Sequence, residues 1–153
     1  MSQLYKKPKE NSSFEWVSFN TLITGSNSSP TFGTTQEFSN YFVIGKLLHI
    51  NFRIRQTSAG TPGSGAYYFS LPHGFTIDGS KVEFDDSSLH GSKVGTCYIH
   101  GIGTNRLEGV CVAFAITQYR MYIGPDLFGV DSGNYHLGLA DITYAANLVL
   151  PIN

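Results

Sequence analysis

The strongest constraint on the fold is a segment, 47–56, in which apolar and polar side chains alternate. The apolar members share one face of an extended chain: Leu48, Ile50, Phe52 and Ile54. The polar members share the opposite face: His49, Asn51, Arg53 and Arg55. A repeat of two residues is that of a β-strand with one buried face, whereas an amphipathic helix repeats about every 3.6 residues. The segment therefore predicts a strand that lies on a hydrophobic core.

Turn residues divide the rest of the chain into short β-prone runs. The run 41–44 is separated from 47–56 by Gly45 and Lys46, which predicts a hairpin with a two-residue turn. Other runs rich in β-branched and aromatic residues predict strands at 14–24, 66–71, 75–77, 81–84, 93–100, 107–117, 118–123 and 139–150. Turn signals recur about every 8 to 12 residues, which is typical of an all-β fold.

The expected architecture is an antiparallel β-sandwich of about 8–10 strands, of the jelly-roll type. An immunoglobulin sandwich would place a tryptophan between two cysteines, but here Trp16 precedes both Cys97 and Cys111. The 153 residues suffice for one domain with its own core. We therefore expect a single domain over 13–153, preceded by a polar, flexible N-terminal arm over 1–12.

Composition narrows the function classes. Ten basic against eleven acidic residues give a net charge of -1, and only 14% of residues are charged, so sequence-blind nucleic-acid binding is not expected. No apolar run reaches the roughly 18 to 20 residues that a transmembrane helix needs, and the pattern of a signal peptide is not seen. We expect that the protein is made in the host cytoplasm and that it does not insert into a membrane.

Sequence motifs for catalysis and cofactor binding are missing. The glycine-rich stretch 60–65 is followed by Ala66 where a phosphate loop needs a lysine, and the Gly-x-Ser-x-Gly pattern of serine hydrolases does not occur. The adjacent acids Asp85 and Asp86 are badly placed to flank a sugar from two sides, and a solvated or turn-capping role in a turn is expected for them. We therefore predict a protein that is not an enzyme and binds no cofactor.

One candidate metal site combines Cys97, His100 and His90. Thiolate and imidazole are donors that zinc prefers. However, residues three apart on a strand point to opposite faces, so Cys97 and His100 cannot share an ion. No metal site is predicted.

The two cysteines also define an expected strand register. If 93–100 and 107–117 form a hairpin centred near Thr104, Cys97 lies opposite Cys111. A disulfide between directly opposed strand residues is usually strained. We expect two buried free thiols that pack as small apolar side chains.

The segment 107–117 carries apolar or small side chains on both faces. A strand of this kind is covered on both sides. Either a second subunit or a loop of the same chain can cover the face that is turned away from the core, and the sequence leaves both open.

Several stretches together resemble a known group of proteins. They are Tyr-Phe-Val-Ile-Gly-Lys at 41–46, the alternating strand after it, the loop 60–65, Tyr-Tyr-Phe-Ser-Leu-Pro at 67–72, and Leu-Val-Leu-Pro-Ile at 148–152. This combination resembles the C-terminal jelly-roll modules of phage tail fibres and of fibre or capsid-surface proteins of large DNA viruses, similar to C1q and tumour-necrosis-factor heads. No collagen-like repeat, heptad stalk or β-helical shaft precedes the module, so a minor capsid component and a fibre head both stay open.

The resemblance implies a viral structural protein of the virion surface that forms a homo-oligomer, with a trimer favoured. Its implied partners are other capsid proteins or a host-surface glycan or receptor. The alternative is a carbohydrate-binding, lectin-like module, because aromatic rings near loops can pack on sugar rings. The candidate residues for glycan or subunit contact are Tyr67, Tyr68, Tyr119, Tyr122 and Tyr135. Tyr67 and Tyr68 are neighbours on a predicted strand, so only one of them can face the core.

Overall fold

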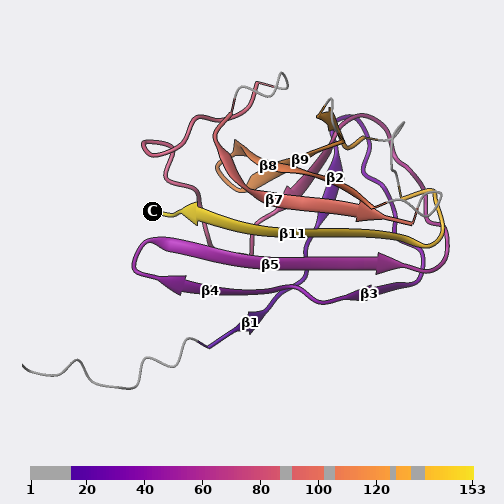
Figure 1. The fold of residues 1–153 in the computed structure, drawn as a ribbon, viewed down its shortest axis with the longest axis horizontal. Coiled ribbons are helices and arrows are strands. Elements are labelled where there is room, and N and C mark those ends of the chain that lie inside the picture. Colours follow the sequence, from indigo (N-terminus) through magenta and orange to yellow (C-terminus); the bar gives the residue numbers. More distant parts are fainter. Residues whose placement is uncertain (1–14, 87–90, 102–105, 125–126, 132–136) are drawn as a thin grey trace, which may run out of the picture.

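One antiparallel β-sheet, curled strongly into a half-barrel, forms the fold (Figure 1). The computed structural model describes residues 15–86, 91–101, 106–124, 127–131 and 137–153. In chain order the strands are β1 (Val17–Ser18), β2 (Ile23–Gly25), β3 (Thr35–Glu37), β4 (Asn40–Ile44), β5 (Leu47–Gln56), β6 (Tyr67–Ser70), β7 (Lys93–His100), β8 (Leu107–Ala115), β9 (Gln118–Ile123), β10 (Phe128–Gly129) and β11 (Ile142–Pro151). Hydrogen bonds join them in the order β1-β4-β5-β11-β7-β8-β9-β6-β2, with β3 added to β5 and β10 to β9. The all-β, antiparallel class is confirmed.

None of the described residues forms a helix of the length and apolar character that crosses a membrane. The N-terminal arm expected over 1–12 lies outside the described residues. The sheet has more strands than the 8–10 expected, because β1, β3 and β10 are pairings of only two or three residues.

The hairpin of β4 and β5 follows the sequence pattern. Ile44 pairs with Leu47, which leaves Gly45 and Lys46 as the two turn residues. Gly45 has a φ of 59°, in the left-handed region that a tight two-residue hairpin turn requires and that glycine adopts without strain. In β5, Leu48, Ile50, Phe52 and Ile54 are buried and the residues between them are largely exposed, so the alternation correctly predicted a strand with one buried face.

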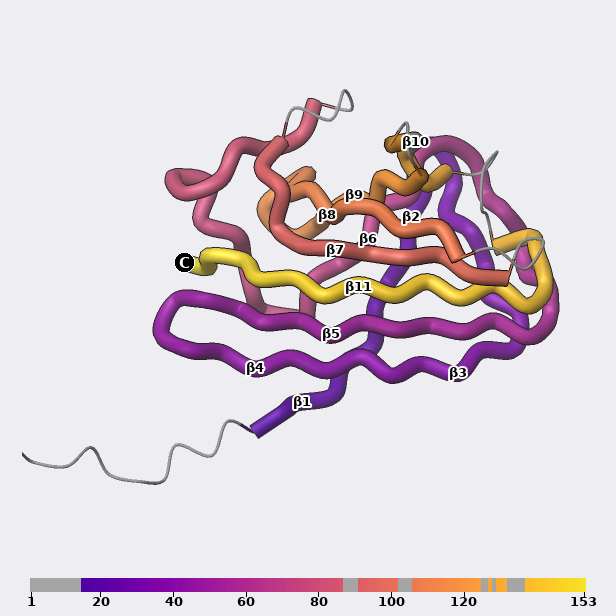
Figure 2. The backbone as a smooth tube through the Cα atoms, viewed as in Figure 1, coloured from indigo at the N-terminus to yellow at the C-terminus, as the bar shows by residue number. Residues whose placement is uncertain are grey.

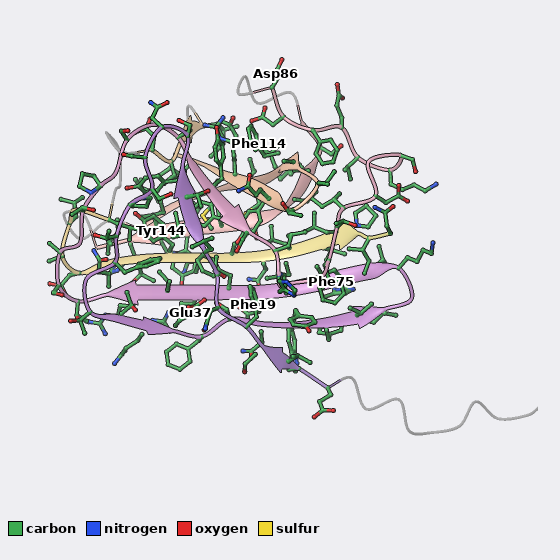
Figure 3. All side chains as sticks on the ribbon, turned by 180° about the vertical axis from the view of Figure 1, so that it is seen from behind. Phe19, Glu37, Phe75, Asp86, Phe114 and Tyr144 are labelled. Atoms are coloured by element: carbon green, nitrogen blue, oxygen red, sulfur yellow. The ribbon has the colours of Figure 1, made fainter. Side chains whose placement is uncertain are left out.

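The curled sheet closes on its core (Figure 2), and contacts between aromatic rings span the space that it encloses. Phe52 of β5 meets Phe69 of β6 edge to face, with ring centroids 5.9 Å apart, although β5 and β6 are not neighbours in the sheet. Phe69 also stacks on Tyr119 at 5.5 Å and contacts Tyr144 at 6.1 Å. Side chains fill the space that the sheet encloses, Tyr144 among them (Figure 3).

Two short strands expected from sequence are wrong. The stretch 75–77 contributes only an isolated bridge between Ile77 and Ile152, and 81–84 forms no strand. Asp78 explains the interruption, because its carboxylate accepts hydrogen bonds from the backbone N–H (3.0 Å) and hydroxyl (2.6 Å) of Ser80. Its carbonyl also accepts a bond from the N–H of Lys81. These local bonds favour a turn over a strand.

Two longer predictions are right in place but wrong in extent. The run 14–24 contains two short strands, β1 and β2, instead of one. The last strand begins at Ile142, not at residue 139, because Asp141 has a φ of 56°, which is incompatible with an extended strand.

The expected opposition of the cysteines is also wrong. In the β7–β8 pair, Cys97 lies opposite Gly109, and Cys111 lies opposite Gly95. The real register is therefore shifted by two residues from a hairpin centred at Thr104. Both cysteines are nevertheless free and buried, as expected. Burial, reinforced by the neighbouring Cys97, raises the pKa of the Cys111 thiol well above its usual value.

The second apolar face of β8 is covered by the chain itself. The N–H of Asp85 donates to the carbonyl of Ala113, and the N–H of Ala113 donates to the carbonyl of Ser92. Residues 83–86 and 91–92, which we call the covering segment, lie over this face of β8. Val112 is buried beneath the covering segment, and the ring of Phe114 stacks on Tyr68 at 4.2 Å. An intramolecular cover, one of the two alternatives that the sequence left open, is therefore present over Val112 and Phe114.

Candidate functional site

The side chains of β5, β11 and β7 that point away from the core form a surface that we call the outer face. The strand register aligns them in three rows: Arg55, Thr143 and His100; Arg53, Ala145 and Tyr98; Asn51, Asn147 and Thr96. Because β11 is the middle strand, each row has a β11 residue between residues of β5 and β7 (Figure 1). Segments far apart in the sequence therefore build one surface.

The first two rows form a hollow, the basic trough. Its floor is low because β11 contributes the small residues Thr143 and Ala145, only 7% and 6% exposed, between larger side chains on both sides. The walls stand two strand spacings, about 10 Å, apart. One hollow of about 480 Å³ is lined by Arg53, Arg55, His100, Gly101, Asp141 and Thr143. A second of about 350 Å³ shares Arg53, His100 and Thr143 and adds Tyr98 and Arg106.

A tight backbone contact bounds one end of the trough. Gly101 has a φ of 117°, and a Cβ at this position would lie 1.8 Å from the carbonyl oxygen of Asp141. Only glycine allows β7 to leave the sheet this close to the start of β11. The contact keeps Asp141, the acidic residue of the lining, at the end of the trough.

Positive charge dominates the trough. Among the described residues, neither Arg53 nor Arg55 lies within salt-bridge distance of a carboxylate. Arg106 stands over the ring of Tyr98, with its guanidinium carbon 3.9 Å from the ring centroid, and its Nε is 3.3 Å from the exposed Glu108. The guanidinium groups of Arg53 and Arg55 thus face solvent and have no carboxylate partner in the described part of the chain.

The outer face becomes apolar toward the other end of β5 and β11. There Phe42 of β4 stacks on His49 at 4.6 Å, and Trp16 meets Phe42 edge to face at 4.5 Å. Val149 lies opposite His49, and it is 44% exposed, while Trp16 is 52% exposed. We call Trp16, Phe42, Leu47 and Val149 the apolar strip. Part of it lines a hollow of about 260 Å³.

The tyrosines singled out from sequence do not form a common surface. Tyr67, Tyr119 and Tyr122 are buried, so their rings do not lie on the surface of the chain, where a glycan or a second subunit would meet them. Tyr68 is half-buried against Phe114, which confirms that only one residue of the Tyr67–Tyr68 pair faces the core. Tyr135 lies outside the described residues.

The hydroxyl groups of the buried tyrosines have structural roles or none. The Tyr67 hydroxyl donates to the carbonyl of Pro62 (2.6 Å) and accepts from the N–H of Leu137 (3.2 Å). The Tyr119 hydroxyl has no hydrogen-bond partner in the described part of the chain. Burial raises the pKa of Tyr119 well above its usual value.

Asp85, for which a solvated or turn-capping role was expected, is a buried residue of the outer layer over β8 and β9. Its Oδ2 accepts a hydrogen bond from the Tyr122 hydroxyl and lies 3.5 Å from Nη1 of Arg120. The guanidinium carbon of Arg120 is also 4.9 Å from the centroid of the Tyr122 ring. Its neighbour Asp86 is exposed and points outward (Figure 3). The buried pair fastens the covering segment to β9.

Sequence reasoning identified one wall of the trough but not the site. The alternation in 47–56 placed Arg53 and Arg55 on the polar face, but nothing local shows that β11 and β7 lie beside it. Tyr98 and Arg106 were not singled out from the sequence, and His100 was considered only as a metal ligand. No group of three metal-binding side chains occurs within the described ranges, and His90 of the rejected zinc candidate lies outside them.

Comparisons with family models, with curated proteins and with solved structures find no match to this chain. Function is therefore inferred from the outer face and from the sequence resemblance.

Proposed function

We propose that the chain is a viral structural protein: a virion-surface, minor capsid or fibre-head component that self-associates and contacts capsid neighbours or a host receptor. In this proposal the curled sheet is a jelly-roll variant, and the protein is not an enzyme. The sequence resemblance supports the viral role. The observation that carries self-association is the apolar strip on the outer face.

The chemistry of the strip favours a second copy of this chain as its occupant. Trp16 and Val149 are about half exposed, and Leu47 is also exposed, so the strip leaves aromatic and aliphatic surface in water. Contiguous patches of this kind mark interaction sites, and aromatic residues are enriched in interfaces. The strip residues carry no formal charge, so identical strips can meet without like-charge repulsion. A trimer is favoured because of the resemblance to trimeric heads.

A matched pair of variants tests this surface. Val149→Glu places a charge in the strip, whereas Ile116→Glu changes an equally exposed apolar residue outside it, in the turn between β8 and β9. In sedimentation velocity we expect Val149→Glu to shift the protein to monomer and Ile116→Glu to sediment like the wild type. Equal sedimentation of the two variants contradicts association through the strip. Absence of the protein from purified virions contradicts the viral role.

The second candidate function is a carbohydrate-binding module. The basic trough is the observation that favours this candidate, because it is a hollow lined by polar and charged side chains. The buried tyrosines do not support it, since their rings do not lie on the surface. Binding of saccharides by a protein that stays monomeric at all concentrations would support this candidate over the structural one.

A further inference from the structure

We propose that the basic trough binds an acidic saccharide, whose carboxylate or sulfate group is held by Arg53 and Arg55. The inference deepens the proposed contact with a host surface and depends on that function only for its biological meaning. The trough itself is a property of the folded chain.

The two arginines are placed to hold one anionic group. Arg53 and Arg55 are two positions apart on β5, so they share a face and their Cα atoms lie about 7 Å apart. Both line the same hollow of about 480 Å³. A guanidinium group presents paired N–H donors that match the oxygens of a carboxylate or sulfate. Because neither arginine has a carboxylate partner among the described residues, a ligand displaces no existing ion pair.

Uncharged polar side chains continue from the arginines along the outer face. Thr143 lies on the floor of the trough, and the adjoining row contains Asn51, Asn147 and Thr96. Hydroxyl and carboxamide groups both donate and accept hydrogen bonds, as sugar hydroxyls require. An anionic group at one end and a hydroxyl-rich body along the row match this order of side chains.

Size and topology favour a small acidic ligand over a polyanion or a peptide strand. The hollows of about 480 and 350 Å³ fall in the usual range of small-molecule sites. A nucleic acid needs many phosphate contacts, but the trough offers only Arg53, Arg55 and Arg106 on a chain of net charge -1. A peptide cannot add as a strand, because β11 already pairs with β5 and β7 on its two sides.

Asp141 gives the trough a direction. Asp141 lines the trough beside Gly101, and its negative charge disfavours an anion at that end. The anionic group of the ligand therefore lies toward Arg53.

Calorimetric titration of the folded full chain tests the site with defined probes. The probes are sialyllactose, a sulfated galactose disaccharide, lactose, inorganic sulfate, an oligothymidylate and an oligoglutamate. We expect at least one of the two acidic sugars to bind at millimolar concentration or below, and lactose and inorganic sulfate to bind at least ten times more weakly. The carboxylated and sulfated probes distinguish which acid group the trough accepts.

Two variants localise the binding. Arg53→Gln is expected to weaken it about tenfold or more, since hydrogen bonds to charged groups are strong. Lys81→Gln removes the same charge from an exposed position outside the trough and is expected to leave binding unchanged. Equal loss in both variants means general electrostatic attraction and overturns the assignment.

Other outcomes also decide the proposal. Failure of both acidic sugars to bind, or equal binding of lactose, overturns it. Binding of sulfate as tight as that of the acidic sugars reduces the trough to a simple anion site. Preference for the oligonucleotide or the acidic peptide assigns the surface to another class of partner. A trimer that binds no sugar refutes this inference alone, whereas a monomer that binds acidic sugar refutes self-association alone.

Discussion

The buried ion pair of Asp85 and Arg120 predicts a large loss of stability for Asp85→Asn. The Arg120 side chain is 7% exposed and that of Asp85 is fully buried. Nε and Nη1 of Arg120 have no hydrogen-bond partner among the described residues, so its charge is compensated by the Asp85 carboxylate and by the face of the Tyr122 ring. The substitution leaves a buried positive charge without its counter-ion.

Removal of one member of a buried ion pair costs about 3–5 kcal/mol. We expect the lower end, because asparagine still accepts the hydrogen bond from Tyr122 and because the Arg120–Asp85 contact, at 3.5 Å, is long. A loss near 3 kcal/mol is large beside the total of about 5–15 kcal/mol that is typical of single domains.

Urea denaturation followed by far-ultraviolet circular dichroism measures this loss. The matched control is Glu108→Gln, which removes an acid 3.3 Å from Arg106 on the surface and is expected to cost at most about 1 kcal/mol. Adding Arg120→Met to Asp85→Asn is expected to restore part of the stability, because the uncompensated charge is then gone. If Asp85→Asn costs no more than Glu108→Gln, the buried pair does not hold the covering segment in place.

Further predictions concern the core. Tyr119→Phe is expected to leave the free energy of unfolding unchanged or to raise it by up to about 1 kcal/mol, because the buried Tyr119 hydroxyl lacks a hydrogen-bond partner among the described residues. Tyr67→Phe loses two hydrogen bonds and is expected to lower the free energy of unfolding by about 1–3 kcal/mol, and the opposite order of the two variants in urea denaturation would contradict this. After denaturation without reductant, a disulfide reagent is expected to detect two thiols, those of Cys97 and Cys111. In the folded protein at neutral pH both thiols are expected to be unreactive, because they are buried. Detection of no thiol in the denatured protein would contradict free cysteines. Burial in the folded state raises the pKa of Tyr119 above the usual value of a tyrosine, about 10, so the stability linked to its protonated form is fully present below about pH 10 and is lost as the pH rises further. Tyr119→Phe is therefore expected to lose less stability than the wild type between pH 9 and pH 11, and equal losses would contradict this origin.

Local patterns predicted the parts of the fold that local physics controls. The alternation of 47–56 needs only one buried face, and the Gly45 turn needs only a residue that accepts positive φ. Both predictions are confirmed for this reason. The strands expected at 75–77 and 81–84 failed where a side chain, Asp78, makes turn bonds that compete with strand pairing.

The parts that depend on long-range pairing could not be read from sequence. Cys97 is displaced by two residues from the expected register, and the pairs from Gly95–Cys111 to Ile99–Leu107 all keep the register that is observed. The β-bulge between Lys93 and Gly95 lies beyond these pairs, so the error is in the hairpin centre, which the sequence pattern alone does not fix. The basic trough exists because β11 lies between β5 and β7 and brings Thr143 and Ala145 between larger side chains. The part of the trough that the sequence pattern did predict is the pair Arg53 and Arg55, which the alternation places on the polar face of 47–56.

The mass of the purified wild-type chain in solution, measured by light scattering at micromolar concentration, tests the central claim of self-association most directly. The account predicts a mass three times that of the 16.8 kDa chain. A mass of one chain at every concentration would contradict it, because the apolar strip would then stay exposed in the free protein.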